Sequence, residues 1–258
     1  MDKAFYESYF KAEKNHWWFR VRRNIIFWLL KKHKVSKTAK IFDFGCGSGY
    51  LVGYLQNLGY GASGGDTSAE AIGFGRSQGI ESLEVIKDGE IGPPEGGLDQ
   101  AKLGFDLILA LDVIEHIQDD YGAIRAIERA LNSGGMAIIT VPAYQWMWGV
   151  QDEASHHYRR YSMSRLADVI KGSGNLKIVH KTYFNTFLFL PIVIVRILSK
   201  WFNLKERESD FDINGGFMNR LFYFIFNLEI YFLKILNFPF GVSILLILKK
   251  NEQSLQKS

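Results

Sequence analysis

A short glycine-rich loop that follows an apolar segment is the feature that most constrains how this chain can fold. Residues 41–44 are mostly apolar and run directly into residues 45–49, Gly-Cys-Gly-Ser-Gly, after which residues 50–58 have the pattern of a helix. Glycine lets the backbone approach a bound molecule closely, and a helix N-terminus offers N–H groups that the helix itself does not use. The segment therefore predicts a strand, a ligand-binding turn and a helix.

The spacing of the glycines separates two classes of cofactor. Dinucleotide-binding turns follow the pattern G-x-G-x-x-G, whose last glycine would fall on residue 50, but residue 50 is Tyr50. An acid, Asp66, lies about 20 residues after Gly45, where a carboxylate that binds ribose belongs in both classes. The glycine spacing therefore disfavours a nicotinamide dehydrogenase and favours an enzyme that binds a different ribose-containing cofactor.

Strand and helix patterns alternate along the rest of the chain, which predicts an α/β fold with a doubly wound, mostly parallel sheet of seven strands. The expected strands are 40–44, a glycine-softened segment ending at Asp66, 83–86, 105–111, 136–141, 176–183 and 241–249. The expected helices are 3–33, 67–78, 121–131, 162–171, 187–203 and 217–236, with a loop over 144–161.

These elements suggest a division of the chain into parts. Residues 1–38 would form an N-terminal helical cap, and residues 39–258 would form the main domain. An apolar helical insert, residues 186–238, would interrupt that domain before the last strand.

Composition narrows the classes of function. The net charge of +4 comes without a dense basic stripe, so we expect no nucleic-acid partner. One cysteine, Cys46, allows no internal disulfide and favours a reducing, cytoplasmic setting, and no metal-ligand spacing is evident. The opening Met-Asp-Lys does not resemble a signal peptide, and the longest uncharged apolar stretch, 182–195, is too short to span a bilayer.

Five motifs occur in the order in which class I S-adenosylmethionine-dependent methyltransferases carry them. They are Ile41–Gly49, Asp66, Asp88-Gly89, Leu111–His116 and Leu131–Gly135. Further segments resemble a bacterial subgroup similar to the ubiquinone-biosynthesis O-methyltransferases. They are His16–Phe19 with Arg22, His157–Tyr161, Tyr183–Asn185 and Pro239–Ser243. The chain departs from the family pattern at Ser63-Gly64-Gly65, where bulkier apolar residues are usual.

The resemblance implies a Rossmann-like fold and S-adenosylmethionine as cofactor. It places Asp66 on the ribose hydroxyls, Asp88 on the adenine amino group and Asp112 beside the methionine end. The residues expected to bind the cofactor are Asp43, Gly45, Cys46, Gly47, Gly49, Asp66, Thr67, Asp88, Gly89, Leu111 and Asp112.

Candidates for the acceptor side lie in other segments. His157 is the preferred general base and His116 the second, since imidazole titrates near neutrality. The expected substrate-binding residues are Trp18, Arg159, Arg160, Tyr161 and Glu229. Two alternatives stay open: the segment around His157 pins its loop by salt bridges, and Trp18 packs its helix onto the domain instead of contacting a ligand.

The apolar insert has three interpretations. It enlarges the core, walls a pocket for an apolar acceptor, or lies on a membrane as an amphipathic surface, and dimerisation through the same surface stays open. Glu229 falls on its aromatic side, where a carboxylate is costly unless paired, so we expect an arginine or a substrate group as its partner.

The leading hypothesis is a methyltransferase that acts on a small or lipid-like acceptor, at oxygen. The alternative is a non-catalytic or membrane-peripheral binding protein that keeps the fold.

Overall fold

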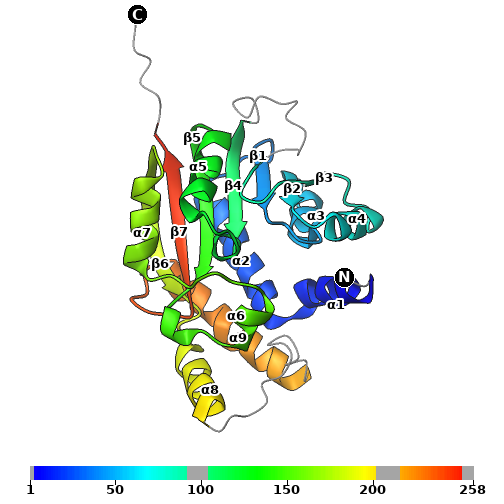
Figure 1. The fold of residues 1–258 in the computed structure, drawn as a ribbon. Coiled ribbons are helices and arrows are strands. Elements are labelled where there is room, and N and C mark those ends of the chain that lie inside the picture. Colours follow the sequence, from blue (N-terminus) through cyan, green and yellow to red (C-terminus); the bar gives the residue numbers. More distant parts are fainter. Residues whose placement is uncertain (1–2, 92–103, 202–215, 252–258) are drawn as a thin grey trace, which may run out of the picture. The chain divides into compact units, whose positions relative to one another are not determined.

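The structure is a computed structural model that describes residues 3–91, 104–201 and 216–251. Within them lies a seven-stranded sheet in the order β3-β2-β1-β4-β5-β7-β6 (Figure 1). The strands are β1 (Lys40–Phe44), β2 (Gly61–Asp66), β3 (Leu83–Val85), β4 (Phe105–Leu111), β5 (Leu131–Pro142), β6 (Leu176–Phe184) and β7 (Ser243–Lys250).

The sheet is mostly parallel, as the alternating pattern predicts. β1 pairs in parallel with β2 and β4, and the parallel pairing continues outward to β3 and β5. β7 runs opposite to β4 (Figure 1). The apolar run of β4 is buried at all but one position, as expected for a strand covered on both faces. The predicted Rossmann-like architecture is confirmed.

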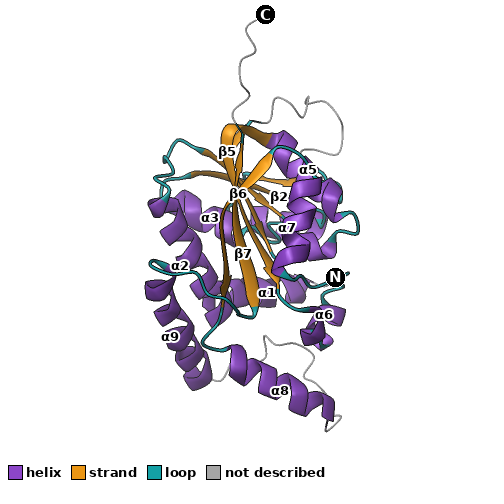
Figure 2. Ribbon diagram, turned by 90° about the vertical axis from the view of Figure 1, so that its left-hand side faces the viewer, coloured by secondary structure: helices purple, strands orange, loops and turns teal. Residues whose placement is uncertain are grey.

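Helices connect the strands and flank the sheet. They are α1 (Lys3–Asn15), α2 (Trp17–Lys32), α3 (Tyr50–Asn57), α4 (Ala69–Ser77), α5 (Asp120–Ala130), α6 (Val150–Ala154), α7 (Met163–Gly172), α8 (Phe189–Trp201) and α9 (Gly216–Leu233), with short 3-10 helices η2 (Ile114–His116) and η3 (Gln145–Met147). Figure 2 shows α3 on one side of the sheet and α5 with α7 on the other, which is the doubly wound arrangement. None of the helices in the described ranges is long and apolar enough to cross a bilayer.

Three segments differ from the sequence prediction. The expected helix 3–33 is broken at His16, whose extended backbone starts α2 and whose Nδ1 accepts a hydrogen bond from the N–H of Trp18. β5 begins at Leu131 instead of residue 136, because Leu131 already pairs with Phe105 before a register shift. The expected loop 144–161 contains η3 and α6.

The chain divides into two compact units. Unit 1 comprises residues 1–35, 141–162 and 182–245, and therefore combines the N-terminal helices with α8 and α9. Unit 2 comprises residues 36–140, 163–181 and 246–258, and holds β1 to β4 with the glycine loop. Strands β5, β6 and β7 each continue from one unit into the other.

The unusual glycines of β2 have a packing reason. A Cβ atom on Gly64 would lie 2.8 Å from both the Cβ of Cys46 and a methyl of Val52. One on Gly65 would lie 2.7 Å from Ile86 and 2.9 Å from Phe42. Larger neighbours therefore fill the space that bulkier β2 residues would occupy, and the strand keeps its register with β1.

Candidate active site

The glycine loop leaves β1 through backbone conformations that favour glycine. Gly45, Gly47 and Gly49 have φ angles of 72°, 56° and 74°. A Cβ on Gly45 would also lie 2.5 Å from a methyl of Val113, so the loop packs tightly against the segment that follows β4. The N–H of Gly45 donates to the carbonyl of Gly65 over 2.8 Å, which joins the loop to β2.

Asp66 fixes the loop from the end of β2. Its Oδ2 accepts a hydrogen bond from the N–H of Gly47 over 2.8 Å, and its Oδ1 accepts one from the N–H of Ser68 over 2.9 Å. Ser68, not the exposed Thr67, caps α4 by accepting from the N–H of Ala71. The carboxylate thus lies at the carboxyl edge of the sheet beside the loop backbone, where a ribose would meet it in folds of this kind.

The other predicted cofactor residues also belong to unit 2. Asp43 and Cys46 are buried, as is Leu111 at the end of β4. Asp112 follows in a left-handed conformation with a φ of 59°, and its N–H donates to the carbonyl of Thr140 over 2.9 Å. Strained non-glycine backbone of this kind is common at functional sites.

Asp88 and Gly89 lie just beyond β3. Asp88 is exposed, and Gly89 has a φ of 71°. His116, the second candidate base, is half-buried in η2. It belongs to unit 2, as do all the residues predicted to bind the cofactor.

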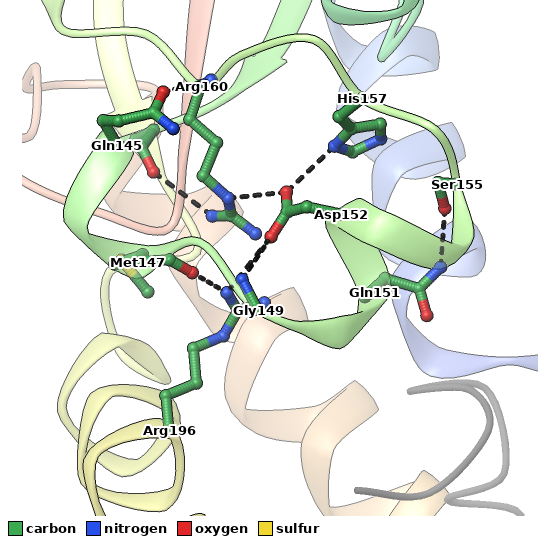
Figure 3. A network of polar contacts seen from close by, with 10 residues as sticks. Gln145, Met147, Gly149, Gln151, Asp152, Ser155, His157, Arg160 and Arg196 are labelled. Carbon is green, nitrogen blue, oxygen red and sulfur yellow. Dashed lines mark hydrogen bonds and ion pairs between the residues drawn. The ribbon is translucent and has the colours of Figure 1, made fainter. Parts of the chain in front are cut away.

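The preferred base, His157, belongs to unit 1 and contacts an acid that the sequence analysis did not select. His157 Nδ1 lies 2.9 Å from Oδ1 of Asp152, a fully buried residue of α6 (Figure 3). The same Oδ1 accepts a hydrogen bond from Nε of Arg160 over 2.7 Å. Asp152 stands five positions before His157 in sequence, outside the motifs named above.

Two further groups converge on this carboxylate. The N–H of Gly149 donates to Oδ2 of Asp152 over 2.8 Å, and Nη1 of Arg196, from α8, lies 3.6 Å from the same oxygen. Arg196 also donates to the carbonyl of Met147. Burial alone would raise the pKa of Asp152, but the hydrogen bonds from His157 and Arg160 and the charge of Arg160 hold that pKa well below its ordinary value.

The rest of the predicted acceptor segment is anchored in unit 1. The guanidinium of Arg160 is buried and also donates to the carbonyl of Ala143 over 3.2 Å. Tyr161 is fully buried, whereas Arg159 is half-buried beside the ring of Tyr158. Arg160 is therefore held by protein groups, as the salt-bridge interpretation expects, and Arg159 has the more exposed guanidinium.

Glu229 is fully buried in α9, but its described partners are backbone groups. Oε2 accepts hydrogen bonds from the N–H of Thr186 over 2.7 Å and of Phe187 over 3.1 Å, while Oε1 has no hydrogen-bond partner among the described residues. Among the described residues, Glu229 therefore has no ion pair with an arginine of the kind that the sequence predicts. Burial raises the pKa of Glu229 to about 7, although the N–H groups of residues 185–187 act in the opposite direction.

Trp18 packs against aromatic rings of the same unit. Its ring stacks on Phe184 and Phe226 with centroid distances of 5.7 and 5.5 Å. Both of those residues are fully buried. The packing interpretation of Trp18 accounts for these contacts, so the stacked rings need no ligand to explain them.

About half of this sequence is similar to curated O-methyltransferases. An O-methyltransferase of ubiquinone biosynthesis from Xanthomonas oryzae pv. oryzae (strain PXO99A) is 25% identical over 135 residues, covering 48% of this chain and 56% of the relative. The corresponding protein of Chelativorans sp. (strain BNC1) is 34% identical over 100 residues, covering 39% of each chain. This chain spans about half the length of the curated relatives it matches.

Solved structures resemble the fold over nearly the whole chain. A TehB-like S-adenosylmethionine-dependent methyltransferase from Corynebacterium glutamicum matches with a TM-score of 0.54 and 18% identity, covering 97% of this chain and 100% of that one. A protein described as a sarcosine dimethylglycine methyltransferase from Galdieria sulphuraria matches with a TM-score of 0.57 and 13% identity, covering 90% and 86%. At these identities the likeness establishes the architecture.

A family model matches a segment that contains both the glycine loop and most of the sheet. The model of the methyltransferase domain matches residues 15–180, more than half of the 258, and includes the glycine loop, Asp66 and Asp112. Membership of that family implies S-adenosylmethionine as the cofactor. With the loop, the acids at the strand ends and this match in agreement, the chain belongs to the methyltransferase domain family.

Proposed function

We propose that this protein transfers the methyl group of S-adenosylmethionine to an oxygen atom of a small or lipid-like acceptor, in the cytoplasm. The proposal rests on the hydrogen bond from the N–H of Gly47, in the glycine loop, to the carboxylate of Asp66, in a chain of the methyltransferase family. The names of the curated relatives support a hydroxyl acceptor.

The residues of unit 2 fit the cofactor. Glycines in left-handed conformations keep Cβ atoms out of the loop, and a carboxylate at the end of β2 offers lone pairs to ribose hydroxyls. Asp88 would hold the adenine amino group and Asp112 would lie beside the methionine end. The sulfonium supplies an already activated methyl group, so positioning of the two reactants supplies much of the rate.

On the acceptor side, His157 would take the hydroxyl proton. Arg159 would bind an anionic group of the acceptor, since its guanidinium is the more exposed of the neighbouring pair. When bound, the cofactor would supply the methyl group to the acceptor oxygen, and the electrons of its carbon–sulfur bond would stay on the sulfur of S-adenosylhomocysteine. The imidazole of His157 would hold the hydroxyl proton and later return it to solvent.

Calorimetric titration with S-adenosylhomocysteine tests the cofactor assignment. We expect wild-type binding and at least a tenfold loss of affinity in Asp66→Ala, because a hydrogen bond to a charged group contributes about 1.5–3 kcal/mol. Asp168→Ala, which removes an exposed acid of α7, is the control and should bind like the wild type. Absence of wild-type binding would refute the proposal.

A second candidate function, peripheral membrane binding, rests on exposed apolar stripes of α8 and α9. In α9 they follow a helical spacing, Phe217, Leu221, Phe224, Leu228 and Tyr231, and Ile235 is exposed just after the helix. In α8 the exposed side chains are Leu190, Ile194, Val195, Ile197, Leu198 and Trp201. Exposed apolar patches of this kind mark interaction surfaces. Two cations are also exposed in this region: Arg220 lies on α9 and Lys234 follows its last residue.

Co-sedimentation with vesicles of phosphatidylcholine and phosphatidylglycerol tests this surface. We expect binding at low salt that the double substitution Phe224→Ser and Leu228→Ser weakens at least tenfold. Val179→Ser, which removes an exposed valine of β6, is the matched control. No sedimentation, together with a dimer that the double substitution dissociates, would assign the stripes to a second copy of the chain instead.

A further inference from the structure

Asp152 is a buried carboxylate at hydrogen-bond distance from the proposed base, and the sequence motifs described above do not include it. We infer that Asp152 is a positioning residue: it keeps the proton of the neutral His157 imidazole on Nδ1 and so leaves the lone pair on Nε2. The inference rests on the proposed function, because it explains how His157 is prepared to act as the base in methyl transfer.

The direction of the hydrogen bond follows from the charge of Asp152. A carboxylate stays ionised when it accepts a hydrogen bond from a guanidinium, here Arg160 Nε over 2.7 Å, and another from the N–H of Gly149 over 2.8 Å. An ionised carboxylate has no proton to donate, so His157 Nδ1, 2.9 Å away, must be the donor. In a neutral imidazole with a proton on Nδ1, Nε2 is the basic atom.

The carboxylate is also held in place. Its own N-terminal turn binds Oδ2 through Gly149, while Oδ1 is shared by Arg160 and His157 (Figure 3). Arg160 is fixed in turn, because its N–H donates to Oε1 of Gln145 over 2.9 Å and its guanidinium binds the carbonyl of Ala143. The imidazole therefore has an immobile partner, which lowers the cost of orienting it for proton transfer.

The charge of Asp152 also favours the second protonation state of the base. When the acceptor proton reaches Nε2, the ring becomes an imidazolium whose Nδ1–H still donates to the carboxylate. An adjacent fixed negative charge stabilises this cation, as the aspartate of a Ser-His-Asp triad does for its histidine. Asp152 itself keeps its charge throughout and gains no proton.

The tautomer can be measured without any acceptor. In ¹⁵N-histidine-labelled protein at a pH where His157 is neutral, long-range proton–nitrogen spectra should show a protonated Nδ1 and an unprotonated Nε2. The His157→Gln variant identifies the resonances. In Asp152→Asn the Nδ1–H pattern should be lost or mixed with the other tautomer, whereas Arg196→Gln, which removes the more distant cation, should keep it.

Steady-state kinetics with a hydroxyl acceptor gives the second readout. We expect Asp152→Asn to lower kcat roughly 10- to 1000-fold and to change the acidic limb of the pH profile of kcat, since general base catalysis contributes about 10²- to 10⁴-fold. The affinity for S-adenosylhomocysteine should stay within twofold. Combining Asp152→Asn with His157→Gln should cost no more than His157→Gln alone.

The outcomes separate the inference from the proposed function. A wild-type His157 protonated on Nε2, or an unchanged tautomer in Asp152→Asn, overturns the positioning role whatever the activity. A drop in kcat with no change in the pH profile makes Asp152 merely structural and also overturns it. Full activity of His157→Gln removes the base role instead, while the Nδ1–H bond to Asp152 would still be observed.

Discussion

At the scale of single residues, Glu229 couples the stability of the fold to pH. Its pKa lies near 7 in the folded chain, against an ordinary value of 4.5, because burial opposes its charge. As pH rises above 4.5, the unfolded chain loses this proton before the folded chain does, so the free energy of unfolding falls until about pH 7. The stabilising state is thus the protonated one, present at low pH.

We expect Glu229→Gln to remove this dependence. Between pH 4.5 and 7.5, the free energy of unfolding of the wild type should fall relative to the variant by up to roughly 3 kcal/mol, at about 1.4 kcal/mol per unit of pKa shift. Urea denaturation across that range measures it, and Glu81→Gln controls for the loss of an exposed acid. Parallel stability curves for wild type and Glu229→Gln would contradict the assignment.

At the scale of elements, two glycines of α4 have opposite surroundings. A Cβ on Gly75 would lie 2.3 Å from the carbonyl oxygen of Ser48 and 2.6 Å from a methyl of Leu83, whereas one on Gly73 would meet nothing within 4 Å. Gly75 therefore lets α4 lie directly against the glycine loop. Gly73 is a solvent-facing helix position at which alanine fits.

We expect the paired substitutions to move stability in opposite directions. Gly73→Ala should stabilise the chain by about 0.5–1 kcal/mol through helix propensity. Gly75→Ala should destabilise it by about 1–3 kcal/mol, because the methyl group must displace backbone, and should weaken S-adenosylhomocysteine binding since Ser48 belongs to the loop. Thermal unfolding measures the stability and calorimetry measures the affinity. If Gly75→Ala left both unchanged, the glycine loop would have moved to make room for the methyl group, and the prediction would be wrong.

How far the sequence predicts each element depends on how local its determinants are. The strand before the glycine loop and the helix after Asp66 follow from adjacent residues, and the structure has both. The start of β5 at Leu131 does not, because it depends on pairing with Phe105 across the sheet. The break at His16 depends on a side-chain hydrogen bond that helical periodicity does not reveal.

The candidate site follows the same distinction. The glycine loop and Asp66 lie within one βαβ unit, so their spacing, together with the resemblance to methyltransferase motifs, predicts both. Arg196 could not be recognised as a partner of Asp152 in this way, because it reaches the carboxylate from a helix more than 40 residues later. The position of Glu229 on the aromatic side predicts an arginine or a substrate group as its partner, yet backbone N–H groups from a distant turn bind one of its oxygens.

At the scale of the whole molecule, unit 1 joins segments from opposite ends of the sequence. The N–H of Trp17, at the start of α2, donates to Asn219 of α9 over 2.7 Å. Further along the same helices, the Nδ2 of Asn24 donates to Asn227 over 2.8 Å. Unit 2, by contrast, finds the pairing partners of β1 to β4 within the continuous segment 36–140.

This pairing of α2 with α9 fixes an order of events during synthesis on the ribosome. Helix α2 leaves the exit tunnel some 200 residues before its partner exists, so its first turn has no Asn219 to cap it in the nascent chain. The segment that carries the glycine loop can fold meanwhile, because domains generally form as their residues emerge. Unit 1 can therefore complete its packing only after the segment that forms α9 has been synthesised.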